Sequence, residues 1–405
     1  MKQICFILLM FCANAVCAQH TFTVKVTNPS STHRTEPVVI TLDSYGEVKS
    51  ALVTTVGNND VPYQLDDLDL DEKADELCFM PDLQPKETRE YTINLYADGE
   101  PRKYEPKVYA EMLMRNDKVK EKNKHDNFVS SLTVRGDCAN SYNLLHHHGV
   151  DFESELNGIR IYFDKRQTID LYGKFKYRLE LKDTQFYTSD EQKKQGYGDD
   201  VLWVGNTFGL GAFRGWNGQE PTMIDPVKNR TQRVIAYGPL RTIVEVIDQG
   251  WIADPSKPAI NMTIRYTQYA YHRDTDVDIT FNRNVDDYRF STGIINVKGS
   301  EEFTDKHGLR ACWGTDYPST DTLKWKPETV GLAVLIPQKH IISEEPANKD
   351  NYAFVVGTQG KSMSYKITYC SANEEEGMHS AKEWFNYLKQ WRKEAEKPFV
   401  VKAVR

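Results

Sequence analysis

The sequence predicts a mainly β protein built from large antiparallel sheets. Apolar and polar residues alternate over many short segments that are separated by turn residues, which is typical of antiparallel strands with one face on a core. A convincing helical spacing of apolar residues occurs only near the C-terminus. We therefore expect few helices, with one at the C-terminal end.

The N-terminus resembles a secretory signal peptide over residues 1–18. Lys2 precedes an apolar run over residues 4–16, and Val16-Cys17-Ala18 provides small residues for cleavage. A lipoprotein signal built on Cys17 is the alternative, but Val16 fits such a site poorly. No later segment has the apolar length of a membrane span. The expectation is a periplasmic or secreted protein.

Composition narrows the class of partner. Without Lys2 and the rest of the signal, 50 basic and 58 acidic residues remain, a net charge of −8, so nucleic acid is not an expected partner. The four remaining cysteines are too scattered for a zinc or redox motif, and at most two disulfides are possible. The 22 tyrosines and 7 tryptophans favour a protein that stacks on sugar rings.

Two structural parts follow the signal. Residues 19–100 read as an N-terminal β-sandwich segment whose acidic loop at 65–72 lacks the pattern of a calcium hand. Residues 101–405 form the main domain, which begins with a charged loop or frayed helix at 115–126.

The main domain then shows its strands and turns in order. The predicted strands cover 159–163, 169–172, 233–237, 240–247, 260–271, 277–281, 331–336, 352–357 and 364–370. The helix begins after Ser380, which forms a capping box with Glu383, and it carries an apolar stripe of Ala381, Trp384, Leu388 and Trp391.

The stretch 144–174 contains many residues whose side chains could take part in catalysis or binding. Its two strands form a hairpin, and placing their apolar residues on one face puts Arg160, Tyr162, Asp170 and Tyr172 on the other, with Lys174 at its end. Arg160 opposite Asp170 would also suit a simple cross-strand pair on a solvated face. Arginine with two tyrosines instead favours a face that binds a saccharide or a carboxylate.

Three consecutive histidines precede this hairpin. In an extended chain His146 and His148 would share a face and His147 would take the other. The first and third could hold a divalent metal with Glu153 or Glu155, or one histidine could be catalytic, or all could be structural. No cofactor is otherwise predicted.

Glycines and aromatic residues alternate over 187–218, in a spacing that excludes a dinucleotide fingerprint. Glycine here would let the backbone approach a ligand beside Trp203 and Arg214, with Asp199 and Asp200 on the rim. Asp199 and Asp200 with Glu155 also admit a two-carboxylate glycosidase, although sequence spacing does not establish their separation.

The stretches HHHGVDFESEL, RIYFDKRQTIDLYGK, GYGDDVLWV and IAYGPLRTIVEV resemble domain of unknown function 4861, a family of secreted proteins from bacteria that degrade polysaccharides. Asn157-Gly158 departs from the family pattern and removes a possible aromatic contact. The resemblance implies a galactose-mutarotase-like β-sandwich or supersandwich. It also implies uronic-acid-containing oligosaccharides or polysaccharides as substrates and, for part of the family, a dehydratase-type elimination.

Elimination from a uronate needs a partner for the carboxylate, a base for the C5 proton and an acid for the group leaving C4. Arg160 is the candidate for the first role. The candidates for base and acid are His147, His148, Tyr162 and Lys174, with His146 as a further histidine. Glu155, Asp170, Tyr172, Asp199, Asp200, Trp203 and Arg214 are the candidate substrate-binding residues.

The sequence therefore predicts a carbon-oxygen lyase of the dehydratase or polysaccharide lyase type. A sugar epimerase or mutarotase, or a glycan-binding protein without catalysis, is the alternative.

Overall fold

Antiparallel strands are the main secondary structure of the computed structural model, which describes residues 19–121, 123–138 and 140–404. The predicted signal peptide over residues 1–18 lies outside the described residues. The prediction of a mainly β fold with few helices and one at the C-terminus is confirmed. Within the described residues, no helix is both long and apolar enough to cross a membrane.

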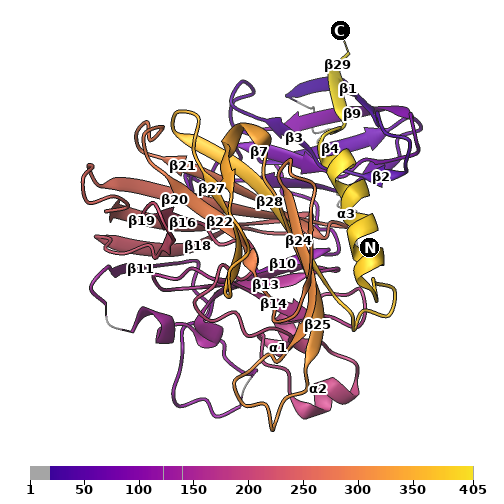
Figure 1. Ribbon diagram of the computed structural model, residues 1–405. Helices are drawn as coiled ribbons and strands as arrows, with labels where there is room; N and C mark the ends of the chain where they lie inside the picture. The colour runs from indigo at the N-terminus through magenta and orange to yellow at the C-terminus, as the bar shows by residue number, and fades with distance from the viewer. Residues whose placement is uncertain (1–18, 122, 139, 405) are drawn as a thin grey trace, which may run out of the picture.

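The N-terminal part of the chain forms three small sheets above the rest of the molecule (Figure 1). The five-stranded sheet runs, in spatial order, β29 (Val400–Ala403), β1 (His20–Thr27), β9 (Thr88–Tyr96), β4 (Ser50–Thr55) and β5 (Asp60–Val61). The other two are β3 (Val38–Thr41), β7 (Glu76–Phe79) and β6 (Tyr63–Asp66), and the pair β2 (Arg34–Thr35) and β8 (Asp82–Leu83). They enclose an apolar core of their own.

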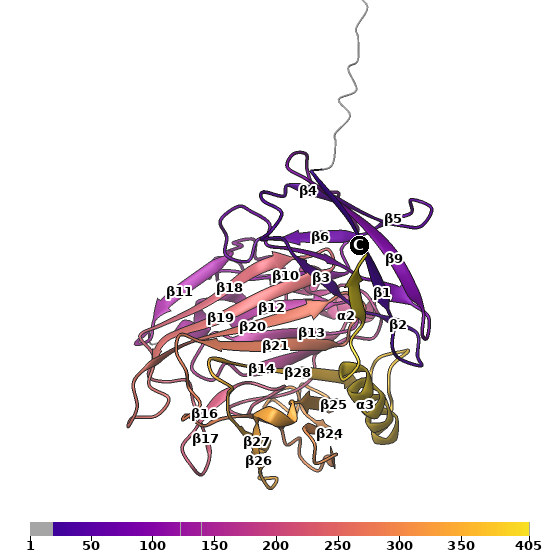
Figure 2. The same ribbon diagram turned by 90° about the horizontal axis from the view of Figure 1, so that it is seen from above.

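A nine-stranded sheet is the largest element of the main part, and Figure 2 shows its strands β18 to β28 side by side. In order it contains β11 (Ser131–Arg135), β18 (Asn229–Tyr237), β19 (Arg241–Trp251), β20 (Ile260–Tyr269), β21 (Asp274–Phe281), β28 (Ser362–Ser371), β25 (Glu328–Leu335), β24 (Leu309–Asp316) and β23 (Glu301–Thr304). Alternation of buried and half-buried residues along β20 and β21 fits a sheet with one face on a core.

Two five-stranded sheets pack against this large sheet and share its apolar core. One contains β17 (Pro221–Thr222), β16 (Arg214–Trp216), β22 (Phe290–Ile295), β27 (Asn351–Val356) and β26 (Ile341–Glu344). The other, here called the site sheet, contains β10 (Val108–Glu111), β12 (Gly149–Ser154), β13 (Gly158–Tyr162), β14 (Ile169–Gly173) and β15 (Asp199–Asp200). Its three middle strands are buried at every residue, so both of its faces are covered.

The predicted hairpin has the expected register in the site sheet. Ile159 pairs with Leu171, Arg160 with Asp170 and Ile161 with Ile169. The apolar residues face the shared core, as the alternation predicts. A register shifted by one residue would have placed them on the polar face instead.

The helices are few. They are α1 (Leu181–Thr184), α2 (Asp190–Lys194), α3 (Ala381–Ala395) and single 3₁₀ turns at Ser141–Asn143, His146–His148 and Gln338–His340. Ser380 caps α3 by accepting a hydrogen bond from the Glu383 N–H, and the predicted apolar stripe is buried on β24 and β25. Short α2 was not predicted, although Ser189 and Gln192 form a capping box there.

The chain returns to its beginning after α3. Strand β29 pairs with β1, so residues 400–403 complete the N-terminal sheet although the predicted main domain included them. The four cysteines of the described chain are free thiols, and three of them are buried.

Candidate functional site

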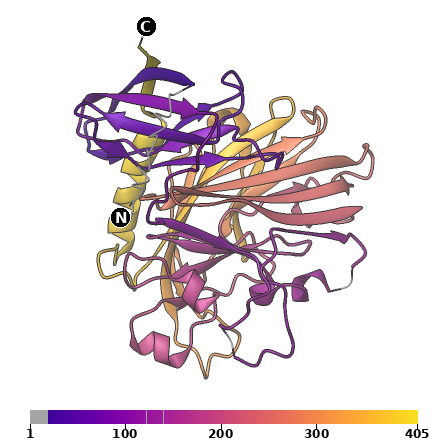
Figure 3. The same ribbon diagram turned by 180° about the vertical axis from the view of Figure 1, so that it is seen from behind.

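A pocket of about 680 Å³ lies where loops from distant parts of the sequence meet beside the site sheet. Figure 3 shows these loops below the sheets, near α1 and α2. The polar and aromatic residues that line it are Arg115, Asn116, Asp117, Lys120, Glu121, His125, His146, His147, His148, Tyr187, Asp199, Asp200 and Trp325. We call this space the histidine pocket. The charged segment 115–126 was predicted as a loop or frayed helix, and its first residues form a loop wall of the pocket.

The backbone is strained at two of the three histidines. His147 and His148 have φ angles of +40° and +71°, a left-handed conformation that is costly for residues other than glycine. Gly149 follows, and a Cβ atom there would lie 1.8 Å from the Ile161 carbonyl oxygen. This tight turn differs from the extended chain that was considered from the sequence, and it directs the three rings to different partners.

His148 has a defined tautomer. Its Nδ1 lies 3.0 Å from the Tyr142 carbonyl oxygen, which only accepts hydrogen bonds, so Nδ1 carries the proton and Nε2 carries the lone pair. The imidazole also stacks on the Tyr142 ring, with 3.8 Å between ring centroids. Burial, and then the positive charge of Arg160, lower the pKa of His148 to about 4. A neutral imidazole in a fixed orientation can act as a general base.

Arg160 lies beneath the pocket and is fully engaged by the protein. Its guanidinium donates to Asp170 at 2.6 and 3.0 Å and to Asp200 at 3.1 Å. Tyr162 donates to the same Asp170 oxygen at 2.8 Å. Arg160 is 4% exposed, and the ring of Phe186 lies 4.2 Å from its central carbon. The cross-strand pair considered from the sequence is present, and it is buried rather than solvated.

A second group of charged residues lies in the same sheet. Glu111 of β10 is directly opposite Asp151 of β12, and Asp151 is directly opposite Arg160. Nε2 of His147 is 3.5 Å from a Glu111 oxygen and 3.4 Å from an Asp151 oxygen. All three side chains are completely buried, and together they have the composition and spacing of a metal-ligand set.

Burial shifts the pKa values of Glu111, Asp151 and His147. It raises the pKa of Glu111 to about 8, and burial with the charge of Glu111 raises that of Asp151 well above its usual value. Burial, and then the charge of Arg160, lower the pKa of His147 to about 3. His147 is therefore neutral, which is the form of imidazole that binds metal ions.

The outer wall of the pocket supplies aromatic and cationic groups. Tyr187 lies edge-on to His146, and burial raises the pKa of its phenol, so the hydroxyl stays protonated. Trp325 is half-buried on the opposite loop, with the Lys193 ammonium 4.6 Å from its ring centre. Arg115 and Lys120 place positive charge at the rim. Phenol, indole and cations are the side chains expected around an acidic sugar.

The structure brings together only some of the residues predicted from the sequence. His146, His147, His148, Asp199 and Asp200 line the histidine pocket. Arg160, Tyr162 and Asp170 form the hydrogen-bond network beneath it.

Lys174 and Tyr172 lie away from the pocket lining. The Lys174 ammonium is buried and donates to Glu153 at 2.6 Å and to the carbonyl oxygens of Ser154 and Arg178. The Tyr172 hydroxyl donates to the Gly198 carbonyl oxygen at 2.8 Å. Both side chains have their polar atoms satisfied within the protein.

Glu155, Trp203 and Arg214 also lie elsewhere. Glu155 pairs with Lys107 at 3.1 Å, and Trp203 is a surface residue, 53% exposed. Arg214 is buried, donates to Thr168 at 2.8 Å and has a pKa lowered to about 10 by burial. None of the three is among the residues that line the histidine pocket.

Several residues of the site were not predicted. Glu111, Asp151, His125, Tyr187 and Trp325 belong to different segments, and their proximity depends on strand pairing and loop placement. For Asp151 a signal was present, since it belongs to the same HHHGVDFE stretch as the histidines.

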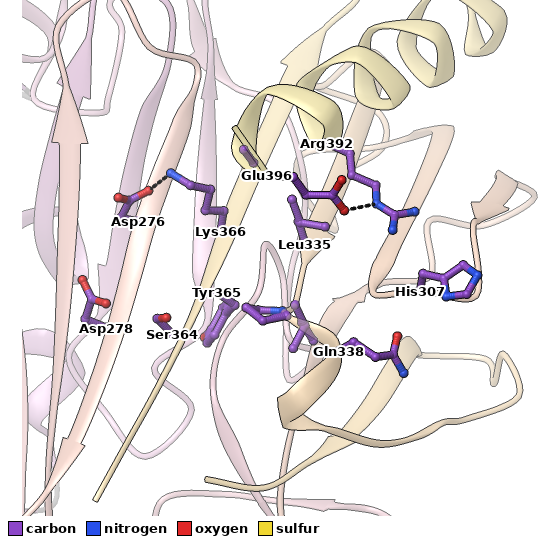
Figure 4. Close-up of a pocket in the computed structure, with 13 residues that line it drawn as sticks. Asp276, Asp278, His307, Leu335, Gln338, Ser364, Tyr365, Lys366, Arg392 and Glu396 are labelled. Atoms are coloured by element: carbon purple, nitrogen blue, oxygen red, sulfur yellow. Dashed lines mark hydrogen bonds and ion pairs between the residues drawn. The ribbon is translucent and has the colours of Figure 1, made fainter. Parts of the chain in front are cut away.

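Another cavity, of about 450 Å³, lies between the large sheet and the end of α3 (Figure 4). Four of its charged residues form pairs: Lys366 contacts Asp276, and Arg392 contacts Glu396 at 3.2 Å. The histidine pocket, with a neutral imidazole and a buried ligand set, is the better candidate for chemistry.

Comparison with family models shows to which protein family the chain belongs. A model described as "Domain of unknown function (DUF4861)" matches residues 26–401. The chain belongs to this family. The match covers most of the N-terminal sheets and the main part.

The comparison with solved structures found distant similarity. Two are a protein in glycosyl hydrolase family 38 and an α-mannosidase, both from Enterococcus faecalis, with 9% and 10% identity and TM-scores of 0.49. Each covers 95% of this chain, whereas the match spans only 47% and 46% of those chains. None of the curated proteins compared with the chain matches it.

Proposed function

We propose that the protein is a carbohydrate-active enzyme that acts on uronic-acid-containing oligosaccharides by β-elimination, in the histidine pocket. The observation that carries the proposal is His148, a neutral imidazole whose Nδ1–H is fixed by the Tyr142 carbonyl oxygen. The remaining nitrogen, Nε2, has the lone pair that a base requires.

Each step of the elimination has a candidate group. Nε2 of His148 takes the C5 proton, the C4=C5 double bond forms, and the C4–O bond breaks. The hydroxyl of Tyr187 gives its proton to the departing oxygen, which leaves as water or as a sugar. The product is an unsaturated uronate, and the enzyme regains its proton balance when Tyr187 recovers a proton from His148 or from solvent.

The substrate carboxylate must be neutralised for the C5 proton to become acidic. Arg160 was the candidate from the sequence, but Asp170 and Asp200 occupy its guanidinium. Arg115 and Lys120 at the rim are the groups that we propose for this role, because both are exposed. Arg115 pairs with Asp117 at 3.0 Å, but this pair is open to solvent, where a substrate carboxylate can replace Asp117. Trp325 offers a ring for the apolar face of a sugar.

The experiment is to incubate the purified protein with a panel of uronate-ended oligosaccharides and to follow ultraviolet absorbance and product mass. Elimination gives a conjugated double bond and therefore a rise in absorbance. We expect His148→Gln and Tyr187→Phe to lower kcat by about 10²- to 10⁴-fold while substrate still binds.

Tyr197→Phe is the matched control, because the Tyr197 hydroxyl donates to Asp183 outside the pocket and its loss should leave kcat unchanged. Unchanged absorbance and mass across the panel, with measurable binding, would overturn the elimination and leave a glycan-binding protein. A configurational change by NMR without a new double bond would instead identify an epimerase.

A further inference from the structure

The site sheet gathers four buried carboxyl groups on its polar side. Asp170 and Asp200 contact the guanidinium of Arg160, Asp151 lies opposite Arg160 in the strand pairing, and Glu111 lies opposite Asp151. Arg160 directs its hydrogen bonds to Asp170 and Asp200. Glu111 and Asp151 therefore face each other across paired strands without a guanidinium between them, so two buried carboxyl groups share one place in the sheet.

The polar atoms of this pair are also unsatisfied. Within the described chain, Oε1 of Glu111, both carboxylate oxygens of Asp151 and Nε2 of His147 have no hydrogen-bond partner. Their side chains have no exposed surface. Buried polar atoms are almost always paired, and one cation placed between these atoms would satisfy them at once.

The spacing of these atoms matches a coordination sphere. Zn²⁺ binds imidazole nitrogen and carboxylate oxygen at about 2.0–2.2 Å, which places tetrahedral ligands about 3.4 Å from one another. The distances from His147 Nε2 to the Glu111 and Asp151 oxygens are 3.5 and 3.4 Å.

The surroundings orient these ligands. The hydroxyl of Tyr109 donates to the other Glu111 oxygen at 2.6 Å, in the manner of a group that orients a metal ligand. His147 lines the histidine pocket, from which an ion would enter.

We propose that Glu111, His147 and Asp151 bind a divalent metal ion, with Zn²⁺ the best fit, at the base of the histidine pocket. This assignment replaces the pair His146 and His148 considered from the sequence. Of the two carboxylates considered with that pair, Glu153 is bound by Lys174 and Glu155 by Lys107. The metal site rests on its own geometry and does not depend on the proposed elimination.

The test measures metal binding directly, without a sugar. The purified protein is treated with a chelator, dialysed and titrated with Zn²⁺ against a chromophoric competitor, and metal content is measured by elemental mass spectrometry. We expect one equivalent of Zn²⁺, a higher Tm on binding, and, with Co²⁺, the visible absorption of a four-coordinate site.

Variants locate the ion. Asp151→Asn and Glu111→Gln keep the side-chain shape and should abolish stoichiometric binding, and Tyr109→Phe should weaken it about 10- to 100-fold. Asp69→Asn is the control, since Asp67, Asp69 and Asp71 form a second acidic group, on the exposed loop, and this change should leave binding intact.

Two results would overturn the proposal. One is chelator-treated wild-type protein that binds less than a tenth of an equivalent of Zn²⁺ and Co²⁺, without a shift in Tm. The other is full binding by folded Asp151→Asn and Glu111→Gln proteins. If both variants fail to fold, the wild-type stoichiometry and Co²⁺ spectrum decide. Because no substrate is present, failure of this test is separate from failure of the elimination assay.

Discussion

Lys174 illustrates how a residue with catalytic chemistry can serve structure instead. Its ammonium is fully buried against Glu153, whose carboxylate also accepts hydrogen bonds from the Glu180 and Leu181 N–H groups at the start of α1. The sequence showed a lysine at the end of a polar strand face, but not that its charge was already neutralised. Lys174 therefore joins the site sheet to the segment that leads to Tyr187.

Replacing Lys174 by Met should destabilise the protein rather than change one catalytic step. The substitution leaves Glu153 buried without its cation, and breaking a buried pair in this way costs about 3–5 kcal/mol. Chemical denaturation measures the free energy of unfolding. Lys176→Met is the control, because Lys176 is half-exposed and its loss should change stability by no more than about 0.5 kcal/mol. Equal stabilities for the two variants would contradict the structural role.

At the scale of elements, local patterns predicted strands and α3 well because their signals lie within a few residues. Alternation set the register of β13 and β14, and the stripe from Ala381 to Trp391 identified the buried face of α3. The site was predicted only in part, since Glu111 meets Asp151 through a strand pair 40 residues apart in sequence, and Trp325 arrives on a remote loop. Such contacts depend on tertiary packing, which leaves little trace in local sequence.

The packing of α3 on β25 gives a test at this scale. A Cβ atom at Gly331 would lie 2.7 Å from Nε1 of Trp384, so Gly331→Ala must displace the indole ring. Overpacking of this kind costs about 1–3 kcal/mol in the free energy of unfolding.

The double variant Gly331→Ala with Trp384→Phe should be less destabilised than the sum of the single changes, because the smaller ring leaves space for the methyl group. Strict additivity in chemical denaturation would show that these two residues do not compete for the same volume.

At the scale of the whole molecule, polar contacts join the N-terminal sheets to the large sheet. Arg241 of β19 pairs with Asp66 and Glu76 at 2.6 and 2.7 Å. His272 lies between the two parts, with Nε2 2.9 Å from the Thr35 carbonyl oxygen and Nδ1 3.1 Å from Asp274. Since both acceptors need a donor, His272 satisfies both only as the imidazolium cation.

This contact predicts a pH dependence of stability. Burial lowers the pKa of His272, but the hydrogen bond and charge of Asp274 outweigh it, and the pKa is raised overall; Glu36 adds to this and Lys366 opposes it. A raised folded pKa contributes stability that is fully present below the unfolded value near 6.5 and lost as pH rises through the folded value.

We therefore expect His272→Gln to lower Tm clearly at pH 5.5, in line with about 1–3 kcal/mol for a charged hydrogen bond, and progressively less at alkaline pH. Thermal unfolding across pH measures the difference. His307→Gln, at an exposed position, should show no such trend. A difference for His272→Gln that is constant from pH 5.5 to 9.5 would refute the imidazolium bridge.

The pairing of β29 with β1 affects how the N-terminal sheet can fold while the chain is being synthesised. The ribosome makes β1 long before β29, so one edge of β1 has no partner until residues 400–403 have been made. An unpaired edge strand readily joins foreign strands. A folding factor that shields residues 24–27 would therefore be most useful until residue 403 has been made, and a chain truncated before residue 400 would keep this edge unpaired for its lifetime.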